Sequence, residues 1–178
     1  MCVVQTPWEK TVEFHGHACP GLALGYRAAQ VALKRLGVER ARDEELVAVV
    51  ANDSCAVDAV QYISGCTLGK GNLYLKDYGK HVYILGRRGE TRGVRVALRF
   101  GVLDGAGSWE ERMEKILHAP EEELFAVKEI ELPPLPAAQI YKTVQCAQFG
   151  EGVAEAKVRV ADGQLLCREC YPEEKRRW

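Results

Sequence analysis

Helix-like and strand-like spacings of apolar residues follow one another through the first 130 positions. After Pro20, apolar residues recur at steps of three and four: Leu22, Tyr26, Ala29, Leu33 and Leu36. This spacing predicts a helix that begins at Pro20, a residue suited to the first helical position, and ends at Gly37. The β-branched run ELVAVVA, from Glu45 to Ala51, predicts a buried strand directly after it.

The pattern continues with helices and strands that do not alternate strictly. Asn52, Asp53 and Ser54 are candidate N-caps of a second helix that runs to about Ser64. HVYILG and VRVALRFG predict two strands joined as a hairpin. A capping box of Ser108 and Glu111 predicts a helix to about His118, and FAVKEIEL predicts another strand. This order favours an α+β fold, with helices packed on a mixed or antiparallel sheet.

A proline-rich segment divides the chain. PPLP, from Pro133 to Pro136, fits neither a helix interior nor a central strand. We therefore expect a core domain over residues 1–132, a linker over 133–141 and a tail over 142–178. The tail of about 40 residues holds three of the seven cysteines and is too small to fold without a staple.

Composition narrows the function classes. The formal net charge is −1, so no overall field attracts nucleic acid or an acidic membrane. The N-terminal segment lacks the pattern of a signal peptide, and no apolar run is long enough to span a membrane, which predicts a cytoplasmic protein. Thiols stay reduced in that compartment, so seven cysteines indicate metal ligation or reactive thiols before disulfides.

The stretch FHGHACPG, from Phe14 to Gly21, gathers groups that bind metals and carry protons. If Phe14 to Cys19 is extended, His15, His17 and Cys19 project from the same side. Cys19 also lies at the N-cap of the predicted helix, where the helix dipole favours a thiolate. One such residue alone is more often structural, but three at alternate positions indicate a functional site.

A second group begins at Cys55. Cys55 and Asp58 are three residues apart and so share a helical face, where a carboxylate can orient a ligand or move a proton. The following loop, GCTLGKGN, does not have the spacing of a phosphate-binding loop, which excludes a nucleotide-hydrolysing site. Lys70 and Asn72 in this loop remain candidate contacts for an anionic ligand or cofactor.

Together these motifs resemble the FmdE family, which is named after one of the subunits of formylmethanofuran dehydrogenase. The resemblance rests on His-Gly-His-x-Cys-Pro-Gly before a helix, on Cys-x-x-Asp-x-x-Gln, and on a Thr-x-Gly-Lys-Gly-Asn loop, and it covers most of the first 130 residues. Membership implies an α+β core that forms intertwined homodimers, sometimes followed by a treble-clef zinc finger. The enzyme behind the name is a molybdenum or tungsten enzyme of methanogenesis, and membership implies no settled activity.

The tail resembles such a zinc finger with one ligand missing. Cys146 begins CAQF, and Cys167 and Cys170 form CREC, with a hairpin expected around Asp162-Gly163. In the family's zinc-finger members the first knuckle is also a cysteine pair, so Phe149 stands where the fourth ligand would be. Zinc bound by three cysteines is one outcome, packing around Phe149 without metal is a second, and pairing of the thiols is a third.

Three functions remain open from the sequence. The first is a dimeric metal-binding accessory protein that delivers or senses a metal, or helps to assemble a molybdenum or tungsten oxidoreductase. Its core would bind Zn²⁺ or another late first-row metal through His15, His17, Cys19 and Cys55. The second is a thiol enzyme for acyl or sulfur transfer, with Cys19 as nucleophile, His17 as base and Asp58 as orienter.

The third is an interaction module built on the tail. Six basic residues there, from Lys157 to Arg177, are offset by six acidic ones, from Glu151 to Glu174. This balance disfavours nucleic acid as the partner.

Overall fold

The computed structural model describes residues 4–132, 135 and 139–171. The chain forms two compact units, Met1–Ala138 and Gln139–Trp178, and each is described by itself. Along the part of the chain that the structure describes, no helix combines the length and the apolar character that crossing a bilayer requires.

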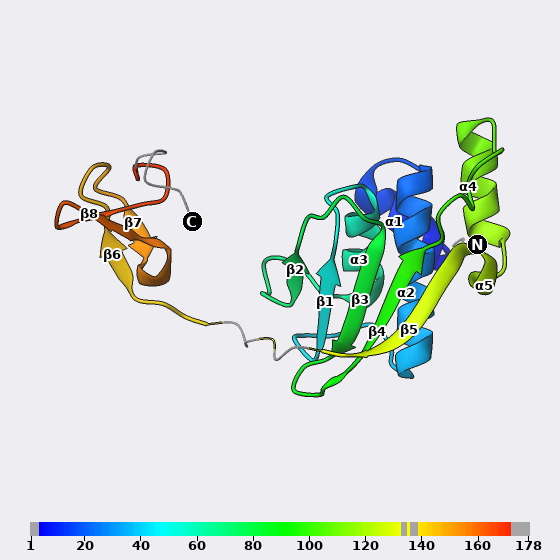
Figure 1. The fold of residues 1–178 in the computed structure, drawn as a ribbon, viewed down its shortest axis with the longest axis horizontal. Coiled ribbons are helices and arrows are strands. Elements are labelled where there is room, and N and C mark those ends of the chain that lie inside the picture. The colour runs from blue at the N-terminus through cyan, green and yellow to red at the C-terminus, as the bar shows by residue number, and fades with distance from the viewer. Residues whose placement is uncertain (1–3, 133–134, 136–138, 172–178) are drawn as a thin grey trace. The chain divides into compact units, whose positions relative to one another are not determined.

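The first unit is built on a five-stranded sheet with the order β2-β1-β3-β4-β5 (Figure 1). The strands are β1 (Leu46–Val50), β2 (Leu73–Leu75), β3 (Val82–Arg87), β4 (Arg92–Leu98) and β5 (Phe125–Glu131). β1 pairs with β2 in parallel, while the β1–β3, β3–β4 and β4–β5 pairs are antiparallel. The sheet is therefore mixed, and the fold class is α+β, as the sequence predicted.

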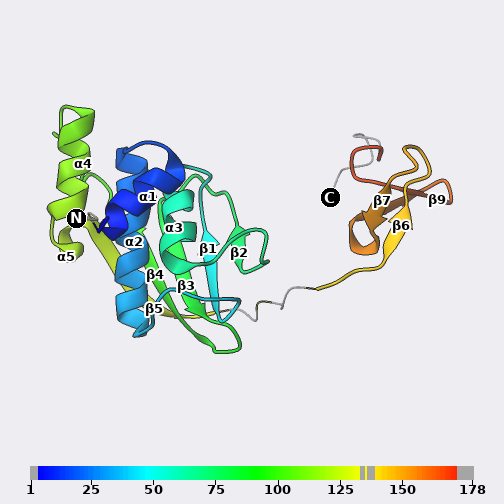
Figure 2. The ribbon, with the colours of Figure 1, turned by 180° about the vertical axis from the view of Figure 1, so that it is seen from behind.

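Helices cover one face of this sheet (Figures 1 and 2). They are α1 (Pro7–His15), α2 (Pro20–Leu36), α3 (Ala56–Ser64), α4 (Trp109–His118) and α5 (Glu121–Leu124). α2 and α3 pack closely because Gly25 has no side chain, and a Cβ atom there would overlap the carbonyl oxygen of Ala56. This close approach places the first turn of α2 beside the first turn of α3.

The core lies between the helices and the sheet. Alternate strand residues such as Ala48, Val50, Leu85 and Val94 are fully buried in it, with Leu24 on the helix side. Period-two burial on the strands and period-3.6 burial on α2 together make one apolar layer. Because this layer is formed by long-range packing, the helix ends at its margin are held in fixed positions.

Most predicted elements of the first unit are confirmed. α2 spans Pro20–Leu36 and ends at Gly37, whose φ of 65° is the left-handed conformation that glycine adopts readily. Ser108 and Glu111 form the predicted capping box of α4. α3 begins at Ala56 with Cys55 as N-cap, so none of the polar residues 52–54 occupies that position.

Two elements were missed and one expectation is wrong. α1 begins after a capping box of Thr6 and Glu9, and its last residue is His15. The short strand β2 follows the glycine-rich loop. Phe14 and His15 are helical and not extended, because the capping box and Pro7 start a helix that continues to Gly16.

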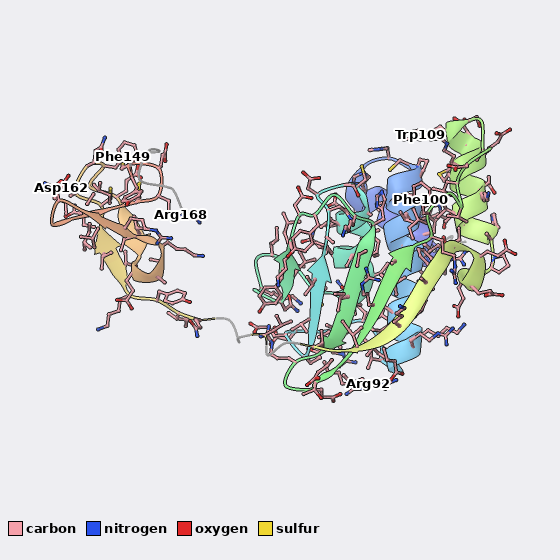
Figure 3. All side chains as sticks on the ribbon, in the orientation of Figure 1. Arg92, Phe100, Trp109, Phe149, Asp162 and Arg168 are labelled. Atoms are coloured by element: carbon pink, nitrogen blue, oxygen red, sulfur yellow. The ribbon has the colours of Figure 1, made fainter. Side chains whose placement is uncertain are left out.

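The second unit contains two small hairpins. The paired strands are β6 (Thr143–Gln145) with β7 (Gly152–Ala154), and β8 (Arg159–Ala161) with β9 (Gln164–Leu166). The 3₁₀ turn η1 (Glu155–Lys157) connects them. Asp162 (Figure 3) and Gly163 have φ angles of 50° and 77°, which confirms the predicted tight turn between β8 and β9.

Candidate metal-binding sites

Four potential ligands converge where three helix ends meet. One donor atom each from His15, His17, Cys19 and Cys55 lies within 4.8 Å of every other in the group. His15 ends α1, His17 lies in the connecting loop, and Cys19 and Cys55 are the N-caps of α2 and α3. The two sequence segments therefore contribute to one site.

The local geometry differs from the expected extended strand. Gly16 has a φ of 98°, a left-handed conformation that reverses the chain after α1. This turn brings the imidazole rings of His15 and His17 together, with 4.5 Å between their centroids. A helix end followed by a glycine turn thus produces the convergence that alternation along a strand was expected to give.

The carboxylate of Asp58 orients one imidazole. Oδ2 of Asp58 lies 2.7 Å from Nδ1 of His15, and the His15 side chain is 10% exposed. The other ring nitrogen, Nε2, is buried and has no hydrogen-bond partner among the described residues. A carboxylate on one nitrogen and an unsatisfied lone pair on the other is the arrangement found around metal-ligating histidines.

The two thiols lie in different local environments. Cys19 is 1% exposed, and its Sγ accepts a hydrogen bond of 3.2 Å from the backbone N–H of Leu22. Cys55 makes no side-chain capping bond, which leaves its sulfur free of the helix end. Burial, followed by the neighbouring Cys19, raises the pKa of the Cys55 thiol. The site therefore places two sulfurs together that cannot easily carry two negative charges without a cation.

Gly21 is a residue of this site that sequence reasoning missed. A Cβ atom at position 21 would lie 3.3 Å from Cβ of Cys55 and 3.9 Å from Sγ of Cys19. Its lack of a side chain lets the first turns of α2 and α3 approach. The only local signal was a glycine inside a first helical turn, where no backbone conformation requires one.

The donor set fits a late first-row metal. Two imidazoles and two thiolates match the tetrahedral Cys₂His₂ ligand set of zinc. Ligands at the usual zinc distances lie about 3.3–3.8 Å apart at the corners of a tetrahedron. The 4.8 Å limit on the present separations needs only a small inward movement to reach that geometry.

The loop candidates Lys70 and Asn72 have other contacts. Asn72 is fully buried, and its Nδ2 donates to the carbonyl oxygens of Asp43 and Leu46. Nζ of Lys70 donates to the same Asp43 carbonyl at 2.9 Å. These bonds hold the loop to the segment that precedes β1. Neither residue belongs to the His/Cys group, and Cys66 is buried in the apolar core.

A second group lies in the tail unit. Sγ atoms of Cys146, Cys167 and Cys170 lie within 4.8 Å of one another, and all three are free thiols. The backbone N–H of Phe149, followed by that of Cys167, lowers the pKa of Cys146 to about 7. Burial, together with the neighbouring Cys167, raises the pKa of Cys170 to about 12.

Phe149 does not form a core for this unit. Its side chain is 49% exposed, in the loop between β6 and β7 (Figure 3). The buried residues of the tail are instead Cys146, Ala161 and Leu166. The expectation of packing around Phe149 is therefore wrong, because the turn that carries the residue points it toward solvent.

Comparisons with known proteins agree with these features. The family profile described as FmdE, molybdenum formylmethanofuran dehydrogenase operon, matches residues 14–129. The chain is 36% identical to a probable S-adenosyl-L-methionine-binding protein of Archaeoglobus fulgidus, over 89% of this chain and 50% of that protein. This chain thus spans about half the length of that curated relative.

A solved structure resembles the chain over most of its length. It is the crystal structure of an FmdE-like protein of the tungsten formylmethanofuran dehydrogenase type from Syntrophus aciditrophicus. The TM-score is 0.71 at 26% identity, and the match covers 92% of this chain and 91% of the other.

Proposed function

The chain belongs to the FmdE family, and we propose that it is an accessory protein that binds a metal ion at the convergence of α1, α2 and α3. The ligands are His15, His17, Cys19 and Cys55. One observation carries this proposal: Nε2 of His15 is buried without a partner among the described residues, beside two thiols, while its other nitrogen is held by a carboxylate. An isolated polar atom in that position is costly unless a ligand satisfies it.

Zinc is the metal that this donor set favours. Imidazole and thiolate together suit Zn²⁺ or another late first-row ion, and a d¹⁰ ion accepts the tetrahedral arrangement without a preference of its own. The metal neutralises the paired sulfurs of Cys19 and Cys55. Asp58 keeps His15 in the tautomer whose Nε2 lone pair faces the site.

The service we propose for this site is delivery of a metal, metal sensing, or assembly of a molybdenum or tungsten oxidoreductase. The description of the family and the name of the Syntrophus aciditrophicus protein support such a partner. We further propose a cytoplasmic, intertwined homodimer, with an FmdE-like core over residues 1–132 and a treble-clef-like tail over 142–178. Sedimentation analysis tests the dimer, and purification of tagged protein from its native cell tests the oxidoreductase partner.

Element analysis of the purified chain tests the core site. We expect the metal content per chain to fall by one equivalent in H17A and in C19A. H118A is the matched control, because His118 is an exposed histidine paired with Glu114 outside the site. C66A controls for loss of a buried thiol that has no part in the group. Unchanged metal content in both H17A and C19A would overturn the proposal.

A thiol enzyme for acyl or sulfur transfer is the second candidate. The contact between Asp58 and His15 beside Cys19 favours it, since a carboxylate, an imidazole and a thiol are the parts of a nucleophilic centre. The imidazole that Asp58 contacts is His15, whereas the sequence suggested His17 as base. Alkylation of Cys19 by iodoacetamide discriminates: protection by bound metal supports the metal site, and rapid modification that survives chelation supports the enzyme.

A further inference from the structure

The two cysteine loops of the tail have the same backbone hydrogen bonds. In the first loop, the N–H of Gly150 donates to the carbonyl oxygen of Cys146 at 2.8 Å. In the second loop, the N–H of Tyr171 donates to the carbonyl oxygen of Cys167 at 3.0 Å. Each bond closes a turn of five residues that begins with a cysteine. The loops are therefore two copies of one local structure.

The sulfur contacts repeat this correspondence. The backbone N–H of Phe149 donates to Sγ of Cys146, as the N–H of Cys170 donates to Sγ of Cys167 at 3.3 Å. Phe149 therefore occupies in the first loop the position that Cys170 occupies in the second. The hydrogen bonds that such loops use to hold a thiolate remain in place, but the first loop has no second sulfur.

Nothing else in the described tail supplies a fourth ligand. Within residues 139–171, the group of mutually close donor atoms contains only Cys146, Cys167 and Cys170. Phe149 is about half exposed, so its ring does not fill the position between the sulfurs and solvent. The apolar core of the tail is small, which makes a metal the natural staple for a unit of this size.

We propose that the tail binds Zn²⁺ through three thiolates and keeps the fourth coordination position open to an exchangeable ligand from outside the chain, water or an incoming thiolate. Closed four-ligand zinc sites are structural, whereas sites with three protein ligands accept and release a fourth ligand. An incoming thiolate adds at the open position before a protein thiolate leaves, so the ion transfers without first being stripped of its ligands. This inference depends on the tail alone and is independent of the function proposed for the core.

The substitution Phe149→Cys tests the inference, because it restores the missing sulfur in a loop that is already formed. Phe149→Ala is the matched control that removes the ring without adding a ligand. The measurements use the full chain with Cys19 and Cys55 changed to Ser, so that Co²⁺ spectra and Zn²⁺ release to a chromogenic chelator report the tail. If that background fails to fold, the difference between the otherwise unchanged chain and its C146S variant gives the same signal.

We expect Zn²⁺ release from F149C to be slower than from the parent by at least about tenfold, as loss or gain of ligand-field support commonly changes metal binding by that factor or more. F149A should release zinc like the parent. Added 2-mercaptoethanol should change the Co²⁺ spectrum of the parent and of F149A, and leave that of F149C unchanged. Equal release rates in all three proteins, or a parent spectrum that does not respond to the thiol, would overturn the open position. Failure of the parent to bind Co²⁺ or Zn²⁺ in the tail would overturn the site itself.

Discussion

Replacement of Asp58 by Asn measures what the carboxylate contributes to the core site. The change preserves the size of the side chain and removes its charge. In the structure the carboxylate lies 2.7 Å from Nδ1 of a nearly buried imidazole, which it orients and makes more basic. Partners of this kind typically contribute about 10–100-fold in metal affinity. The Asp58 side chain is 42% exposed, so solvent weakens the contact, and we expect the lower end, about tenfold.

A tenfold loss corresponds to about 1.4 kcal/mol of binding free energy. Competition for Zn²⁺ between the protein and a chelator of known affinity measures it directly. Asp53→Asn is the matched control, because it removes the same charge from an exposed position two residues before Cys55. If D58N and D53N bind zinc with equal affinity, Asp58 does not act on the site through His15, and the orienting role is refuted.

Three further outcomes follow from the packing. Gly25→Ala should lower the free energy of unfolding by about 1–3 kcal/mol in urea titrations, because its methyl group overlaps the backbone of Ala56, while G69A, with open space around it, should change it little. Burial lowers the pKa of His81, so its contribution to stability is present above about pH 6.5 and is lost as the pH falls through the lowered value; H81Q should therefore reduce the acid sensitivity of the unfolding midpoint, and unchanged sensitivity would contradict this. Removal of metal by a chelator should increase backbone hydrogen exchange in residues 139–171, whereas equal exchange with and without metal would show that the tail folds unaided.

The contact of His81 explains why acid acts there. Nδ1 of His81 lies 3.1 Å from the hydroxyl of the buried Tyr83, and Nδ2 of Asn52 donates to that hydroxyl at 3.4 Å. The tyrosine O–H is then free to donate to a neutral imidazole. Protonation turns Nδ1 into a donor and removes this bond, so the folded protein resists the proton that the unfolded chain accepts.

Local signals in the sequence predicted the elements with clear boundaries. Pro20 and Gly37 bound α2 as expected, and Ser108 with Glu111 begins α4. The same kind of signal at Thr6 and Glu9 was present and was missed, because the following residues show no strong apolar pattern. The short strand β2 has little pattern of its own, and its pairing with β1 depends on a partner more than twenty residues away.

The sequence by itself determined which chemical groups this protein has, where its helices begin, and that Cys19 caps one of them. Only the tertiary structure decided that Cys55 and Asp58 reach the histidines. His15 and Asp58 are 43 residues apart, and their contact requires α1 and α3 to pack beside α2. Caps and turns are local and can be predicted from neighbouring residues. The meeting of three helix ends depends instead on long-range burial, including the side-chain-free approach at Gly25, which no local pattern encodes.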